Sequence, residues 1–142
     1  MRHGEDLSLT HVMLLVGDQD EALTFYRDLI GLQVRTDMPF GDNLRWLTVG
    51  PVDQKHLEFV LEVPEMAPDP AYQEAAKARI ASGVQSTIIF ATDDLDGTFV
   101  RIRDAGAEVA QPIVNQQYGR DCAFRDPWGN QIRFNARHAH HG

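Results

Sequence analysis

Each of four polar residues stands near the middle of an apolar segment that reads as a β-strand: His11, Glu58, Thr87 and Arg133. Since successive side chains of a strand point to opposite faces, each polar residue shares its face with apolar neighbours. These neighbours are Met13, Leu15, Val60 and Ile89. A sheet face in open water would explain polar residues alone, whereas a mixture of polar and apolar side chains is typical of a ligand pocket. The pattern therefore favours a half-polar cup that binds a small molecule.

The first half of the chain reads as a strand, a helix and three more strands. Residues 7–16 alternate as a strand does. Asp18 can cap the helix, with Glu21 three residues later completing a capping box, and Gly31 can end it. The remaining strands are expected at residues 33–38, 44–49 and 56–63, with turn residues between them.

The second half repeats this order after a linker at residues 64–84. Asp69 and Pro70 can start a short helix within the linker, and Gly83 can close it. A second helix is expected between the first two of four strands, which are predicted at residues 85–92, 107–114, 120–125 and 130–136. The tail at residues 137–142 is expected to fray, and its three histidines could bind a metal adventitiously.

An internal repeat relates the two halves at an offset of 75 or 76 residues. Arg27-Asp28 falls on Arg103-Asp104, and Gly31 falls on Gly106. The same offset pairs His11 with Thr87 and Glu58 with Arg133. We therefore predict one α+β domain in which two tandem βαβββ modules, residues 7–63 and 85–136, form curved mixed sheets around a cup.

Four segments carry a resemblance to a known family: Leu9-Thr-His-Val, residues 20–32, residues 91–96 and Asp126-Pro-Trp-Gly-Asn-Gln-Ile-Arg-Phe. They are similar to the vicinal oxygen chelate superfamily, which contains glyoxalases, extradiol dioxygenases, fosfomycin-modifying enzymes and bleomycin-resistance proteins. The last segment is specific, because family members commonly end in Asp-Pro-x-Gly-Asn followed by a strand. The resemblance implies the paired βαβββ modules of the glyoxalase/bleomycin resistance/dioxygenase fold and a homodimer.

The resemblance also implies where a metal would bind. Metal-dependent members place a His on the first strand and a Glu on the last strand of a module, and these positions match His11 and Glu58. The second module has Thr87 and Arg133 there instead, and a guanidinium repels a cation and cannot be a ligand. We therefore expect no metal and no cofactor, with Arg133 free to pair with Glu58. His11 and Glu58 remain a fallback metal site, and His56 and Glu62 are possible rescue ligands.

Metal-free members of the bleomycin-resistance type bind a drug and sequester it without chemistry. We accordingly expect a protein that sequesters a bulky organic molecule, an antibiotic above all, and so confers resistance. The expected binding residues are His11, Met13, Phe40, Trp46, Glu58, Thr87, Tyr118 and Arg133. Further aromatic residues, Phe124 and Trp128, also read as lying near the rims, and alternation does not settle the side on which Trp46 lies.

Two enzymatic alternatives stay open. One is a metal-dependent lyase, isomerase or dioxygenase of the glyoxalase type that uses His11 and Glu58. The other is a metal-free enzyme with Glu58 as general base, which ranks lower because a nearby arginine makes a carboxylate a weaker base.

The composition indicates which kinds of binding partner and which cellular compartment to expect. Thirteen Lys and Arg against 21 Asp and Glu give a net charge of −8, which argues against nucleic acid and anionic membranes and mildly favours a cationic ligand. The single cysteine, Cys122, excludes an intrachain disulfide and suits a reducing compartment. No apolar run approaches the roughly 20 residues that span a bilayer, and no apolar signal core follows Met1. We expect a cytoplasmic protein.

Overall fold

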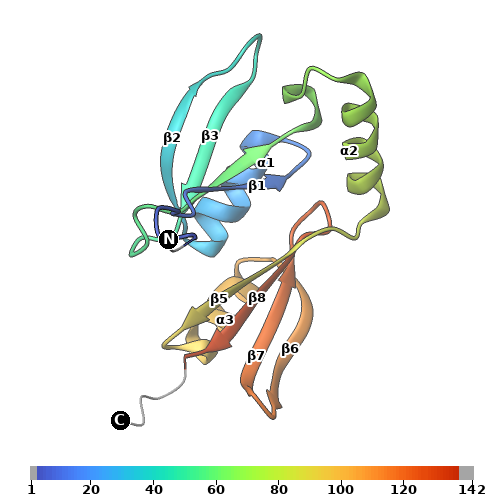
Figure 1. The fold of residues 1–142 in the computed structure, drawn as a ribbon. Coiled ribbons are helices and arrows are strands. Elements are labelled where there is room, and N and C mark those ends of the chain that lie inside the picture. The colour runs from blue at the N-terminus through green and yellow to red at the C-terminus, as the bar shows by residue number, and fades with distance from the viewer. Residues whose placement is uncertain (1–2, 138–142) are drawn as a thin grey trace. The chain divides into compact units, whose positions relative to one another are not determined.

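The computed structural model describes residues 3–137, so the histidines of the tail lie outside the described residues. The chain divides into two compact units, Met1–Ala76 (unit 1) and Lys77–Gly142 (unit 2). Each unit contains its own four-stranded mixed sheet with a helical segment against it (Figure 1). The expected α+β fold with two βαβββ modules is confirmed.

Unit 1 contains β1 (His11–Leu15), α1 (Gln19–Leu23), the π-helix η1 (Thr24–Ile30), β2 (Gln33–Pro39), β3 (Arg45–Gly50), β4 (Glu58–Glu62), the 3-10 helix η2 (Pro64–Met66) and the start of α2 (Pro70–Ser82). Its strand order is β1-β4-β3-β2. Strands β1 and β4 are parallel, and the other neighbours are antiparallel.

Unit 2 contains the end of α2, β5 (Thr87–Thr92), α3 (Leu95–Asp104), β6 (Glu108–Gln116), β7 (Gly119–Arg125) and β8 (Gln131–Ala136). Its strand order is β5-β8-β7-β6, with β5 parallel to β8. This order and these directions repeat those of unit 1, which confirms the internal repeat found in the sequence.

The first helix begins as the sequence predicts and then changes its type. The Asp18 carboxylate accepts a hydrogen bond from the Glu21 backbone N–H at 2.8 Å. From Thr24 to Ile30 the helix is a π-helix with i→i+5 bonds, which the spacing of its apolar residues did not reveal. Tyr26 and Ile30 remain buried in this wider form. Gly31 ends the helix at φ +100°, a conformation that glycine adopts without strain.

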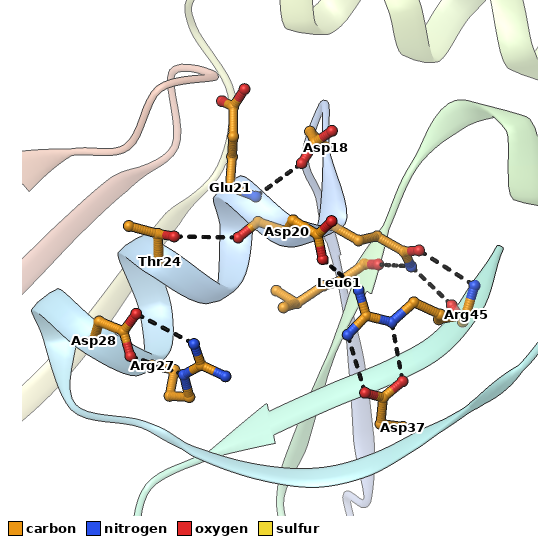
Figure 2. Close-up of polar contacts among 10 residues, drawn as sticks. Asp18, Asp20, Glu21, Thr24, Arg27, Asp28, Asp37, Arg45 and Leu61 are labelled. Atoms are coloured by element: carbon orange, nitrogen blue, oxygen red, sulfur yellow. Dashed lines mark hydrogen bonds and ion pairs between the residues drawn. The ribbon is translucent and has the colours of Figure 1, made fainter. Parts of the chain in front are cut away.

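Polar side chains bind the start of α1 to the sheet (Figure 2). Arg45 of β3 donates to both carboxylate oxygens of Asp37 at 3.0 and 2.9 Å and to Asp20 of α1 at 2.6 Å. The buried Gln19 amide donates to the backbone oxygens of Arg45 and Leu61 at 2.7 and 3.1 Å. Because backbone carbonyls in both β3 and β4 accept from one buried side chain, the helix is held to one face of the sheet.

The helix-facing sides of the two sheets form the cores. In unit 1 this side carries Leu14, Leu47, Val49, Phe59 and Leu61, all buried. In unit 2 it carries Cys122, Phe124, Ile132 and Phe134, also buried. Phe124 is fully buried and lies 5.5 Å from the ring of Phe99, and Trp128 is 8% exposed. These two aromatics therefore belong to the core and not to the rims where the sequence placed them.

The Asp126–Asn130 turn joins β7 to β8 as the sequence predicts. The Asp126 carboxylate accepts from the backbone N–H groups of Trp128 and Asn130 at 2.9 and 2.8 Å. Gly129 has φ +90°, and a Cβ there would lie 2.3 Å from the backbone of Gly83. Only glycine suits this position. Among residues 3–137, no helix is both long and apolar enough to cross a membrane.

Candidate functional site

The face of the unit 1 sheet that points away from α1 carries the residues predicted for ligand binding. The register pairs His11 with Glu58 and Met13 with Val60 across β1 and β4. Thr48 lies opposite Val60 on β3, so Trp46, two residues earlier, shares their face. The structure thus settles the side on which Trp46 lies and brings four predicted residues of unit 1 onto one face.

Glu58 is oriented by hydroxyl groups from β3, the strand next to it, and from β2, the strand beyond. The Thr48 hydroxyl donates to Glu58 Oε1 at 2.5 Å, and the Thr36 hydroxyl donates to the same oxygen at 3.4 Å. The second oxygen, Oε2, lies 3.6 Å from Nε2 of His11. Nδ1 of His11 lies 2.9 Å from the hydroxyl oxygen of Thr10. Oε1 is therefore satisfied within the protein, whereas Oε2 faces the exposed imidazole and can accept a further hydrogen bond.

Three rings form a row beside this carboxylate. Trp46 lies between Phe40 and His11, with ring centroids 5.9 and 6.3 Å away and interplanar angles of 50° and 51°. The Phe40 backbone N–H donates to the carbonyl of Leu44 at 2.9 Å, which closes the β2–β3 hairpin next to the outer ring. Phe40 keeps 39% of its surface exposed. We name Phe40, Trp46 and His11 the ring row.

At the far end of the same face, a side chain of α2 bonds to β4. Tyr72 donates its hydroxyl to Glu62 at 2.8 Å, and Glu62 is only 9% exposed. Glu62 also lies four residues from Glu58, about 13 Å along the strand. It is therefore not placed to rescue a metal site at His11. His56 precedes β4 and lines a separate hollow with Leu9 and Leu57.

In unit 2 the expected counterparts of His11 and Glu58 are not direct neighbours. Thr87 pairs with Gln131, and Arg133 pairs with Ile89. The register of β5 on β8 is therefore displaced by two residues from the arrangement that the repeat offset suggests, although all four side chains share one face.

Arg133 is part of a polar network that the sequence did not predict. Its Nη2 donates to Asp121 Oδ2 at 2.6 Å and to Gln111 at 2.9 Å, and its Nη1 donates to Gln131 at 3.0 Å. Tyr118 donates its hydroxyl to Asp121 Oδ2 at 3.0 Å. Arg133 forms an ion pair within its own unit, because Asp121 on β7 lies next to β8 and is only 1% exposed. The expected pairing of Arg133 with Glu58 stays a prediction.

The hydrogen bonds and charges of this network shift the pKa values of Asp121 and Tyr118. Burial acts to raise the pKa of Asp121, but hydrogen bonds from Arg133, Gln111 and Tyr118 outweigh it, so the pKa lies below its usual value. Burial and the bond to Asp121 raise the pKa of Tyr118. Asp121 stands directly before the apolar run Cys122-Ala123-Phe124 of β7, so the sequence could have indicated it as a polar residue beside the core, although not as the partner of Arg133.

His11 and Glu58 supply fewer ligands than a protein metal centre usually has. His11 and Glu58 offer two donors, whereas catalytic metal centres in proteins such as zinc enzymes usually have three protein ligands. Within residues 3–137, no group of three or more His, Cys, Asp or Glu side chains is placed to hold a metal. No chemical step is therefore assigned to a metal at this site.

The chain resembles proteins of one family over nearly its whole length. The model of the Glyoxalase/Bleomycin resistance protein/Dioxygenase superfamily matches residues 8–134. The crystal structure of UcmS2 is 35% identical, covers 95% of this chain and 98% of its own, and has a TM-score of 0.77. TnmS3, described as an antibiotic binding protein from Streptomyces sp. CB03234, is 28% identical with a TM-score of 0.73, covering 96% of this chain and all of its own.

A relative by sequence is the uncharacterized protein YurT of Bacillus subtilis (strain 168). It is 31% identical over 121 residues, which cover 84% of this chain and 91% of YurT. The match to the family model, the repeated βαβββ units and these relatives agree. The chain belongs to the glyoxalase/bleomycin resistance protein/dioxygenase superfamily.

Proposed function

We propose that this protein binds a flat organic molecule of the antibiotic kind and sequesters it without chemical change. The observation that carries the proposal is the ring row beside the Glu58 carboxylate on the open face of unit 1. Aromatic rings at such spacings offer a stacking surface for a planar ligand. The similarity to TnmS3, an antibiotic binding protein, also supports the proposal that this protein binds such a ligand.

The polar part of this surface defines the ligand further. Because Thr48 and Thr36 satisfy Oε1 of Glu58, the second oxygen is the acceptor that remains for an N–H, O–H or cationic group of the ligand. Met13 is 48% exposed on the neighbouring strand and offers a polarizable apolar contact. Binding of this kind needs area and a few orienting groups, and it needs no activated nucleophile. Resistance by sequestration, as a homodimer in the cytoplasm, is the biological setting that the proposal implies.

Thermal-shift screening against natural-product antibiotics, followed by titration of the strongest compound, tests this proposal. Trp46→Ala should weaken the affinity by at least about tenfold, since it removes the central ring of the row. Val52→Ala is the matched control, because Val52 is 52% exposed in the β3–β4 connection and should leave the affinity unchanged.

The released ligand should have an unchanged mass. Turnover of the bound compound by the wild-type protein, detected by mass spectrometry, would contradict sequestration and favour an enzyme. Equal affinities of the wild type and Trp46→Ala would show that the ring row is not the binding surface.

A further inference from the structure

Two of the four methionines of the chain are exposed on the open face of unit 1. Met13 on β1 is 48% exposed, and Met38 on β2 is 55% exposed. Met13 lies opposite Val60 in the β1–β4 register, and Met38 lies opposite Trp46 in the β2–β3 register. Because residues opposite each other share a face of the sheet, both thioethers lie on the face that carries Glu58 and Trp46.

The two methionines flank the residues that the proposed function uses. The strand order β1-β4-β3-β2 makes β1 and β2 the edge strands of the sheet and places β4 and β3 between them. Glu58 and Trp46 belong to these two central strands. Neighbouring strands lie about 4.8 Å apart, so each methionine is one strand away from one of these two residues. A ligand that spans the ring row and Glu58 therefore lies between the two thioethers.

The sulfur atom of Met66 is protected in a way that suits it as a comparison. The Met66 side chain is half-buried. Its Sδ accepts from the backbone N–H of Val63 at 3.4 Å and from the Gln19 amide at 3.8 Å. An oxidant attacks a lone pair of the thioether, and exposed methionines are therefore oxidised first. We expect peroxide to oxidise Met13 and Met38 before Met66.

The thiol of Cys122 is a poor competitor for the same oxidant. Cys122 is buried, and burial with the nearby Asp121 charge raises its pKa to about 11. Since the thiolate is the form of cysteine that reacts, little of this side chain is reactive at neutral pH. Among residues 3–137, the sulfur atoms of Met13 and Met38 are thus the ones that peroxide reaches most easily.

We propose that Met13 and Met38 are oxidation sites that control ligand binding on the open face of unit 1. Hydrogen peroxide transfers one oxygen atom to the thioether: the O–O bond breaks, an S=O bond forms, the sulfur loses two electrons, and the other oxygen leaves as water. The sulfoxide is polar, so an apolar ring can cover it only by removing its water. This control rests on the proposed function, because it acts on the affinity for the sequestered molecule.

Reduction reverses the modification. A methionine sulfoxide reductase that uses a dithiol returns the thioether, with the sulfoxide oxygen released as water and the dithiol oxidised to a disulfide. Oxidation should therefore release the ligand, and reduction should restore binding without new protein synthesis.

Peptide mapping by mass spectrometry after brief treatment of the full chain with hydrogen peroxide tests the order of oxidation. Met13 and Met38 should each gain one oxygen atom before Met66 does, and Cys122 should stay unmodified. Met1 lies outside the described residues, so its peptide is followed separately. Oxidation of Met66 or Cys122 as fast as that of Met13 and Met38 would overturn the assignment of the sites.

Titration with N-phenyl-1-naphthylamine tests the effect on binding. This neutral aromatic amine has one N–H that can donate to Glu58, and its fluorescence increases in apolar surroundings. Peroxide should weaken its affinity for the wild type about tenfold, as expected when a polar group is covered by an apolar ring. Treatment with methionine sulfoxide reductase and dithiothreitol should restore the affinity, and this arm of the experiment needs no variant.

The variants are compared by the ratio of the affinities before and after peroxide. Met13→Leu/Met38→Leu keeps apolar side chains of similar size and has no sulfur at these positions, so its ratio should be close to one. Met66→Leu is the matched control, and its ratio should equal that of the wild type.

An equal loss of affinity in the wild type and the double variant would overturn the control by oxidation, and so would complete oxidation of Met13 and Met38 without a loss. Both results would leave the proposed function standing. Failure of the untreated wild type to bind N-phenyl-1-naphthylamine would also overturn the control, whereas the antibiotic screen would still decide the proposed function. Failure of every antibiotic to bind would refute both.

Discussion

The Asp121–Arg133 pair should contribute measurably to stability, and Asp121→Asn is the change that tests it. The substitution keeps the size of the side chain and removes its charge, which leaves Arg133 with an uncompensated charge that is only 18% exposed. Removing one partner of a buried pair costs about 3–5 kcal/mol. Arg133 keeps its bonds to Gln111 and Gln131, so we expect a smaller loss of about 2–3 kcal/mol in the free energy of unfolding.

The loss should depend on pH with a defined sign. Because the pKa of Asp121 is lowered in the folded protein, its stabilisation is complete above the ordinary aspartate pKa of about 3.9 and disappears as the pH falls through the lower folded value. Urea denaturation should therefore show a large difference between wild type and Asp121→Asn at neutral pH. That difference should shrink as the pH falls below the ordinary aspartate pKa of about 3.9.

Two further variants complete the experiment. Asp96→Asn breaks the exposed ion pair with Arg120 and should cause no measurable loss. The double variant Asp121→Asn/Arg133→Gln also removes the unpaired charge of Arg133 and should recover part of the stability lost in the single variant. A neutral-pH difference below about 0.5 kcal/mol for Asp121→Asn, or one that persists unchanged in acid, would refute the reasoning.

Three other predictions concern the core, the thiol and the assembly. Asp126→Ala should lower the free energy of unfolding by about 3 kcal/mol, since it leaves the buried N–H groups of Trp128 and Asn130 without an acceptor. A loss below about 1 kcal/mol in urea denaturation would contradict this. Cys122, whose pKa burial and the Asp121 charge raise to about 11, should be alkylated by iodoacetamide only after unfolding, and rapid labelling of the native protein, seen by mass spectrometry, would speak against its burial. Sedimentation at micromolar concentration should give twice the 16.0 kDa of the chain, and a monomer would rule out the homodimer.

The secondary structure and the repeat could be predicted from the sequence because their causes are local. Alternating apolar residues define the strands, and Asp18 and Asp126 bond backbone groups within four residues of themselves. Gly31 and Gly129 take positive φ values that other residues avoid. The change from α- to π-helix at Thr24 was not predicted, since both helix types keep Tyr26 and Ile30 on the buried side.

The partners of the polar residues were decided only by the tertiary structure. The sequence indicated that His11, Glu58, Thr87 and Arg133 lie on faces opposite the core, because alternation depends on neighbouring residues alone. Which residues meet across strands depends on sheet register, which the chain sets through its turns and core packing. Register places Trp46 on the face of His11 and brings Asp121, twelve positions away in sequence, to Arg133. A long-range ion pair of this kind leaves no local pattern in the sequence, so the structure alone identifies the charge that Arg133 balances.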